Sequence, residues 1–179
     1  ETPEDLIPQF EIIRECVDAF NIPQLEIEGY EADDIIATYC KLAKKQKIDS
    51  IIVSSDKDLM QLVTKEITML DPMKNKKISI EQVIEKFGLP PDKVIQIQAL
   101  TGDKVDGYDG IEGVGIKTAE KLISKYTNVR LPDLWKIVKG IYKEKGYTEK
   151  EALQQARVAH ILRHGDYNKK TGKVKLWKI

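Results

Sequence analysis

Seven carboxylates in three short segments are the residues of this chain whose types and spacing are best suited to chemistry. Carboxylates gathered in a fold repel one another, and burying them without cations is costly. Hard oxygen ligands suit Mg²⁺ or Mn²⁺, and two such ions roughly 3.5–4 Å apart would need about this many carboxylates. The segments predict a metal site formed by Glu31, Asp33 and Asp34 in GYEADD, Asp56 and Asp58 in SSDKD, and Asp103 and Asp106 in TGDKVD.

A glycine-rich turn, GIEGVGIKT, follows the third acidic segment directly. Glycines allow the backbone to approach a phosphate closely, and the amides at the start of the next helix can receive it. Contacts of this kind grip a nucleic-acid backbone without reading its sequence. The predicted DNA-binding residues are Gly110, Gly113, Gly115, Lys117, Thr118 and Lys121.

Each of these features also has a simple structural explanation. Acidic residues are favoured in the first turn of a helix, so the first two segments could be helix caps. Asp103 and Asp106 could lie in a solvated loop, and the glycine-rich turn could merely connect two helices. Three acidic segments ahead of a phosphate-binding turn are harder to explain as caps, which favours metal-dependent chemistry on a phosphate backbone.

The charge of the chain is divided between its two parts, although 29 basic and 29 acidic residues give a net charge of zero. Residues 1–112 carry 13 Lys and Arg against 23 Asp and Glu, a net charge of −10. Residues 113–179 carry 16 against 6, a net charge of +10. This asymmetry is typical of a metal site beside a surface that grips phosphates.

Composition limits the class of protein. Hydrophobic residues make up 41% of the 179 residues, which predicts a globular fold, and no apolar run approaches the length of a membrane span. We expect Cys16 and Cys40 to be buried, reduced thiols and the protein to be cytoplasmic, in a bacterial or phage-infected cell. Because the first residue is Glu1 and not Met, we expect the chain to be cropped from a longer one.

The elements that must position these residues can be predicted from local patterns. Thr2-Pro3-Glu4-Asp5 predicts a helix start, and a second helix is expected over residues 31–47. The apolar run 51–53 predicts a fully buried parallel strand, so SSDKDL would lie at the carboxyl end of a strand, where open α/β sheets bind ligands. A second strand is expected at 67–70. Capping boxes at residues 79–82 and 148–151 and a proline at 132 predict further helices.

These motifs together resemble the 5′-nuclease family, which comprises flap endonucleases, phage 5′-exonucleases and the 5′→3′ exonuclease domain of bacterial DNA polymerase I. The segments TPEDLIPQF, GYEADDIIAT, SSDKDLMQLV, ALTGD and GIEGVGIKTAEKL occur in family order. Residues 1–106 resemble the polymerase I domain most, whereas DGYDGIEGVGIKTAEKL and EALQQARVAHILRHGDYNKKTGKVKLW resemble short-tailed-phage exonucleases.

The resemblance implies an α/β fold, with a mostly parallel twisted sheet and helices, in a PIN-like nuclease core over residues 1–80. It also implies a helical lobe over residues 81–179, with a helix-hairpin-helix-type DNA-binding turn at about 99–126. By resemblance, Glu31, Asp33, Asp34 and Asp56 serve a first metal ion, and Asp58, Asp103 and Asp106 serve a second. A K⁺ ion at the hairpin turn is also implied.

The family also uses aspartates from an N-terminal strand and a helical arch that threads the 5′ strand, and this chain begins after both. We therefore expect an amino-terminally truncated core, and residues 1–179 alone to be inactive or severely impaired.

The activity implied by the resemblance is metal-dependent 5′→3′ exonuclease or flap endonuclease cleavage. Its substrate would be duplex DNA with a 5′ end, flap or junction, or an RNA primer on DNA. The resemblance further implies a monomer, with a fused or associated DNA polymerase as partner. The alternatives are a non-catalytic duplex-DNA-binding module, in which the acidic segments are structural, and an RNA-specific nuclease, which the hairpin turn makes less favourable.

Overall fold

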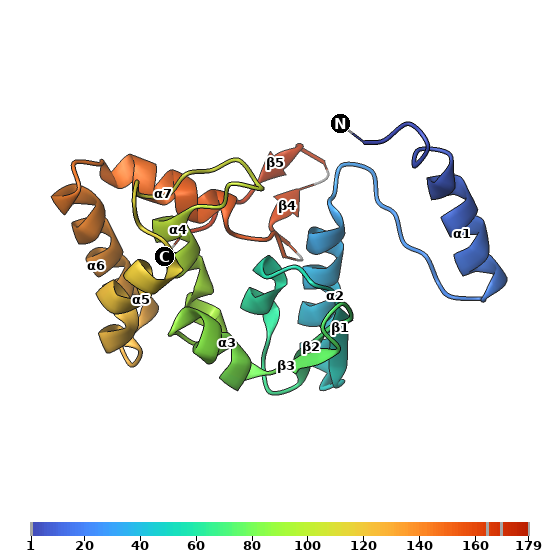
Figure 1. Ribbon diagram of the computed structural model, residues 1–179, viewed down its shortest axis with the longest axis horizontal. Helices are drawn as coiled ribbons and strands as arrows, with labels where there is room; N and C mark the ends of the chain where they lie inside the picture. The colour runs from blue at the N-terminus through green and yellow to red at the C-terminus, as the bar shows by residue number, and fades with distance from the viewer. Residues whose placement is uncertain (1, 164, 169, 179) are drawn as a thin grey trace. The chain divides into compact units, whose positions relative to one another are not determined.

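The structure is a computed structural model of the chain and describes residues 2–163, 165–168 and 170–178 (Figure 1). Its contacts divide the chain into two compact units, Glu1–Ala32 and Asp33–Ile179. Within the described residues, no helix is long and apolar enough to cross a membrane.

Helices dominate the described residues, and strands form two small sheets. The helices are α1 (Gln9–Ala19), α2 (Ala32–Gln46), α3 (Ile80–Phe87), α4 (Val94–Thr101), α5 (Ile116–Ile123), α6 (Leu131–Glu144) and α7 (Glu149–Val158), with 3-10 turns η1 (Asp58–Leu62), η2 (Pro91–Lys93) and η3 (Ser124–Tyr126). The strands are β1 (Ser50–Val53), β2 (Ile67–Asp71), β3 (Lys76–Ile78), β4 (Tyr167–Asn168) and β5 (Lys173–Val174).

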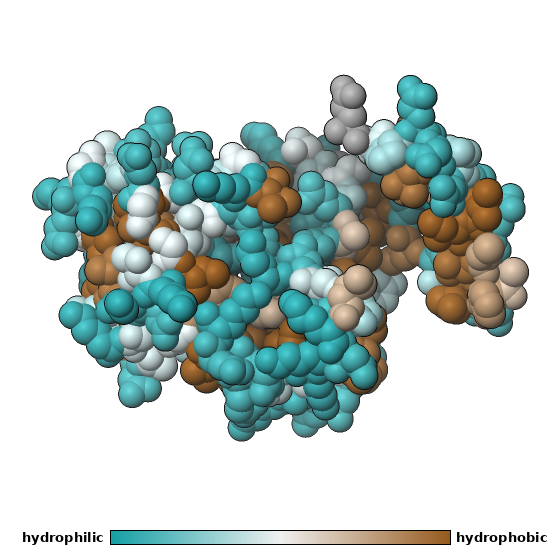
Figure 2. All heavy atoms as spheres, in the orientation of Figure 1, coloured by the Kyte–Doolittle hydropathy of each residue, from teal (hydrophilic) through white to brown (hydrophobic). Residues whose placement is uncertain are grey.

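The first unit consists of α1 and its flanking segments. The predicted helix start at Thr2 is wrong, because turns precede α1, which begins at Gln9 directly after Pro8. Proline has no amide to donate and its ring clashes with a preceding helical turn, so it suits the beginning of a helix rather than its interior. No residue of α1 is buried, and Figure 2 shows hydrophobic side chains on the surface of this segment. Cys16, predicted to be buried, is therefore exposed.

The second unit begins with α2 and a three-stranded sheet in the order β1-β2-β3. As predicted, β1 and β2 are parallel, with Ser50 opposite Ile67, while β3 joins β2 in the antiparallel sense. The prediction of a fully buried β1 is wrong: Ile52 faces the core, but the side chains of Ile51 and Val53 are 64% and 63% exposed. Alternate residues of a strand point to opposite faces, and only one face of β1 meets the core.

Helix α4 is the centre of the helical part, where α5, α6 and α7 pack against it (Figure 1). Every residue from Val94 to Leu100 is buried, so this helix is enclosed on all sides. The buried Tyr142 hydroxyl of α6 donates to the backbone carbonyl of Ala99. Both predicted capping boxes are confirmed, the first at the start of α3 and the second at Thr148 before α7. The apolar core thus fixes α4, whose C-terminal end leads directly into TGDKVD.

Candidate metal centre

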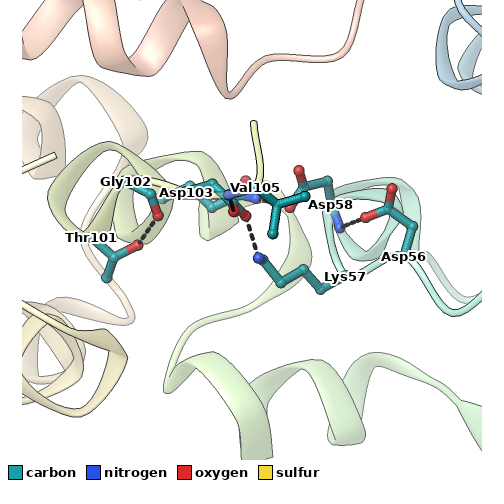
Figure 3. A network of polar contacts seen from close by, with 8 residues as sticks. Asp56, Lys57, Asp58, Thr101, Gly102, Asp103 and Val105 are labelled. Atoms are coloured by element: carbon teal, nitrogen blue, oxygen red, sulfur yellow. Dashed lines mark hydrogen bonds and ion pairs between the residues drawn. The ribbon is translucent and has the colours of Figure 1, made fainter. Parts of the chain in front are cut away.

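Three of the seven predicted carboxylates converge in the structure. Asp58, Asp103 and Asp106 each offer an oxygen, and these oxygens all lie within 4.8 Å of one another. Asp58 opens η1, just beyond the carboxyl end of β1, and the other two residues lie in the loop that follows α4. Figure 3 shows Asp58 and Asp103 approaching each other from these two segments. We call these three residues the acidic cluster.

Hydrogen bonds from its own turn and from helix α4 hold Asp58 in place. The Asp58 amide donates to Oδ1 of Asp56 at 2.8 Å, and the Asp56 amide donates to the Ser54 hydroxyl at 3.1 Å. From the buried helix α4, the Gln98 side-chain amide donates to Oδ1 of Asp58. This turn therefore ties the loop after β1 to the central helix, so that the core determines the position of the carboxylate.

The loop that carries Asp103 is closed by backbone pairing. Asp103 and Tyr108 exchange two backbone hydrogen bonds of 2.7 and 3.0 Å, and the Val105 amide donates to Oδ1 of Asp103 at 2.9 Å. Gly102 and Gly110 pack backbone to backbone beneath this loop: a Cβ at Gly110 would lie 2.3 Å from the Gly102 nitrogen. Gly110 also has a φ of +63°, so two independent constraints require glycine there.

The surroundings of Asp58 and Asp103 shift the pKa values of these two carboxylates in opposite directions. Burial, a hydrogen bond with Asp106 and the charge of Asp56 together raise the pKa of Asp58 from 3.8 to about 7. Burial also acts to raise the pKa of Asp103, but hydrogen bonds from Lys57 and backbone amides outweigh it and hold that pKa below its usual range. The same contact with Asp103 raises the pKa of Lys57. Asp103 is therefore ionised beside a cation, while Asp58 resists ionisation.

The donor set fits a hard divalent cation. Carboxylate oxygens are the preferred ligands of Mg²⁺ and Mn²⁺, and the cluster offers one such oxygen from each of three residues. Opposite oxygens around Mg²⁺ lie about 4.2 Å apart, given bonds of about 2.1 Å. Oxygens that lie within 4.8 Å of one another are therefore close to the spacing that such an ion requires.

Three of the other predicted ligands, Asp33, Asp34 and Asp56, lie in the same unit but do not join this cluster among the described residues. Asp33 and Asp34 lie in the first turn of α2, where Oδ1 of Asp34 accepts the Leu162 amide at 3.2 Å. Asp56 is exposed and caps the turn at Asp58. Glu31 belongs to the first unit. Asp56 therefore acts as the predicted cap, whereas Asp34 accepts an amide from a distant segment and does not cap α2 through that bond.

The glycine-rich turn leads into α5 as predicted. Gly113 and Gly115 are exposed, and a Cβ at either position would meet no atom within 4 Å. Along α5, Ala119 and Ile123 are buried, and the opposite side carries the exposed residues Lys117, Thr118 and Lys121. The turn therefore presents free backbone and a basic stripe to solvent, whereas Gly110 is buried by its contact with Gly102.

Two residues that contact the acidic cluster were not predicted from the sequence. Lys57 forms an ion pair with Asp103, and Gln98 binds Asp58 from the core. The position of Lys57 between two predicted ligands in SSDKD was a usable signal, because a cation there partly neutralises them. No local signal marks Gln98, which lies in the buried helix α4, forty residues from its partner.

Comparison with known proteins gives matches over most of the chain. Residues 1–88 match the sequence model described as 5′-3′ exonuclease, N-terminal resolvase-like domain, and residues 89–165 match 5′-3′ exonuclease, C-terminal SAM fold. A DNA polymerase I of Rhizobium leguminosarum is 58% identical over 124 residues, which is 69% of this chain and 12% of that protein. A 5′-3′ exonuclease of Aquifex aeolicus is 43% identical over 129 residues, 72% of this chain and 45% of that protein.

Solved structures show the same fold. A T5 5′-exonuclease with bound divalent metal ions (zinc) matches with a TM-score of 0.65 and 20% identity, covering 84% of this chain and 58% of that one. The catalytic core of Rad2 in complex with DNA substrate matches with a TM-score of 0.50 and 19% identity, covering 88% and 50%. The chain spans less than half the length of the two curated relatives named above.

Proposed function

The chain belongs to the 5′-3′ exonuclease family, and on that basis we propose that it serves metal-dependent hydrolysis of phosphodiesters in DNA. The substrates would be 5′ ends, flaps or junctions of duplex DNA, and RNA primers paired to DNA. The observation that carries this proposal is the convergence of Asp58, Asp103 and Asp106 from distant parts of the sequence. Carboxylates this close together repel one another, and a bound cation would relieve that repulsion.

We propose that Asp58, Asp103 and Asp106 hold one Mg²⁺ or Mn²⁺ ion. Asp56, which caps the Asp58 turn, would act with Glu31, Asp33 and Asp34 toward a second ion, as the family resemblance implies. A divalent ion bound here would stabilise the charge that develops on the phosphorus and lower the pKa of water. Gln98 and the Asp56 cap would keep the Asp58 oxygens in place, which is the contribution of the fold to positioning.

The glycine-rich turn and α5 would grip the DNA backbone. Gly113 and Gly115 leave room for a phosphate to reach the amides at the start of α5, and Lys117, Thr118 and Lys121 present their side chains to the same solvent. Gly110 would act indirectly, by shaping the loop, and a K⁺ ion could be held by backbone oxygens of the turn. We further propose a nuclease core at residues 1–80 and a DNA-binding lobe at residues 81–179, which also contributes Asp103 and Asp106 to the metal centre.

The relatives that the chain matches support a proposal about its setting. We propose that these residues work as part of, or beside, a DNA polymerase in the cytoplasm, acting as a monomer during replication and repair.

The cleavage test uses the natural protein that carries residues 1–179, because the curated relatives are longer than the chain. Its substrate is a duplex with a labelled 5′ flap. We expect cleavage with Mg²⁺ or Mn²⁺, none with EDTA, and a loss of at least about 100-fold in Asp103→Ala, as is usual for removal of a group that stabilises transition-state charge. Asp109→Asn, an exposed neighbour, is the control. Full activity in Asp103→Ala with unchanged metal dependence would rule out the proposed role of the cluster.

The DNA grip is tested separately, by fluorescence anisotropy of a labelled duplex with residues 1–179. Gly115 has a φ of −85° and open space around it, so Gly115→Ala should fold normally and still weaken binding, because its methyl group would keep a phosphate away. Replacing both Lys117 and Lys121 by Gln should reduce the slope of log affinity against log salt by about 1–2. Wild-type affinity in both variants would refute this part of the proposal.

A further inference from the structure

The acidic cluster contains a cation of its own. The Lys57 ammonium forms an ion pair with Oδ2 of Asp103, and within the described residues no other cation pairs with a carboxylate of the cluster. The Asp103 side chain is 5% exposed and the Lys57 side chain 35%, so the carboxylate is fixed while the ammonium sits at the solvent edge. Figure 3 shows Lys57 reaching from the SSDKD segment toward Asp103.

Each oxygen of Asp103 already has one partner: Oδ1 accepts the Val105 amide, and Oδ2 meets Lys57. Each oxygen keeps a second lone pair, so a divalent cation can still bind this carboxylate. A cation bound to either oxygen would lie within a few ångströms of the ammonium, and a +2 and a +1 charge repel each other twice as strongly as two unit charges. Release of the ammonium is the cheaper outcome for a side chain with a flexible four-carbon stem.

We propose that Lys57 is an exchangeable counter-cation: it neutralises Asp103 in the metal-free protein and leaves that carboxylate when a divalent ion binds. This inference rests on the proposed function insofar as the cluster is a metal site. Lys57 thereby keeps the buried carboxylate from standing unpaired, and it lowers the affinity for the metal. The released ammonium would lie beside the metal centre, where it can contact a phosphate of the nucleic acid.

The test measures Mn²⁺ binding to residues 1–179 by calorimetry at constant pH and ionic strength. Lys57→Met keeps the length of the side chain and removes its charge, so we expect binding about 3- to 30-fold tighter than in the wild type. Lys57→Arg keeps the charge and should stay near the wild type. Lys104→Met removes the same charge from an exposed neighbour of Asp103 that forms no ion pair among the described residues, and should change the affinity less than about threefold.

Thermal unfolding gives a second readout. With EDTA, Lys57→Met should melt below the wild type, because buried Asp103 loses its partner, and added Mg²⁺ should raise its melting temperature more than that of the wild type. If Lys57→Met does not fold, NMR of the wild type decides: the Lys57 side-chain resonances, assigned with Lys57→Arg, should shift and sharpen as Mg²⁺ saturates the protein.

Three results would overturn the inference. They are equal or weaker Mn²⁺ binding in Lys57→Met, an equal gain in Lys104→Met, and Lys57 resonances that Mg²⁺ leaves unchanged. If the folded wild type binds no Mn²⁺ at all, the metal site of the proposed function is wrong as well. If the wild type binds Mn²⁺ and Lys57→Met binds it with the same affinity, only the proposed role of Lys57 is wrong.

Discussion

Asp58→Asn should stabilise the metal-free protein at alkaline pH. The pKa of Asp58 is raised to about 7 by burial, by its hydrogen bond with Asp106 and by the charge of Asp56. The folded protein thus holds the Asp58 proton more tightly than the unfolded chain does. Its stabilising effect is complete below the unfolded pKa of 3.8 and is lost as the pH rises through about 7. Asn is neutral at every pH and avoids this loss.

The size of the effect follows from the same pKa. The difference between 3.8 and about 7 corresponds to roughly 4 kcal/mol, and partial exposure of Asp58 to water reduces this to about 1–2 kcal/mol. For a domain of this size, the melting temperature should rise by about 3–6 °C. Asn can still accept the Gln98 amide and can donate to Asp106, so both hydrogen bonds of the carboxyl group survive.

The assay is thermal unfolding of residues 1–179 followed by circular dichroism, in EDTA, at pH 8 and at pH 4. Asp58→Asn should gain stability at pH 8 and nothing at pH 4, and Asp109→Asn, exposed in the neighbouring loop, should gain nothing at either pH. With Mg²⁺ at pH 8 the order should reverse, because the variant has lost a ligand. A variant that is less stable than the wild type at pH 8 in EDTA would refute the reasoning about charge in the cluster.

Two further predictions concern the frame around the site. Gly110→Ala should lower the free energy of unfolding by about 2–4 kcal/mol and weaken Mn²⁺ binding, because its Cβ would lie 2.3 Å from a backbone nitrogen at a φ of +63°. Gly115→Ala, which has open space around it, is the control and should melt like the wild type. Equal melting temperatures for the two variants would contradict the close packing at Gly110. Thr148→Ala should cost about 1 kcal/mol in denaturant unfolding because it removes the hydroxyl that caps α7, and no change would show that the cap is dispensable.

Local sequence patterns predicted where helices and strands lie better than they predicted which of their residues are buried. The capping box before α7 depends on residues three apart, and the helix begins where Thr148 places it. The exposure of Ile51 and Val53 was not predictable in this way, because an apolar run does not reveal which face of a strand will be covered. In α1, the capping pattern at Thr2 was outweighed by Pro8, which fixes the beginning of the helix.

The candidate site was predictable in composition but not in geometry. The acidic segments identified Asp58, Asp103 and Asp106, yet nothing local indicated that these three would meet and that Asp34 would instead accept a backbone amide. Their meeting depends on α4, which carries Gln98 to Asp58 and ends at the loop of Asp103. Contacts between distant segments of this kind follow from packing of the core, not from spacing along the chain.

The most direct test of the central claim is calorimetric titration of residues 1–179 with Mn²⁺, in the wild type and in Asp106→Asn. Asp106 is exposed, so the substitution should leave the fold intact, which circular dichroism can check. The account predicts saturable binding in the wild type and binding at least about tenfold weaker in the variant, about 1.4 kcal/mol. Equal binding by the two proteins, or no binding by the folded wild type, would contradict it.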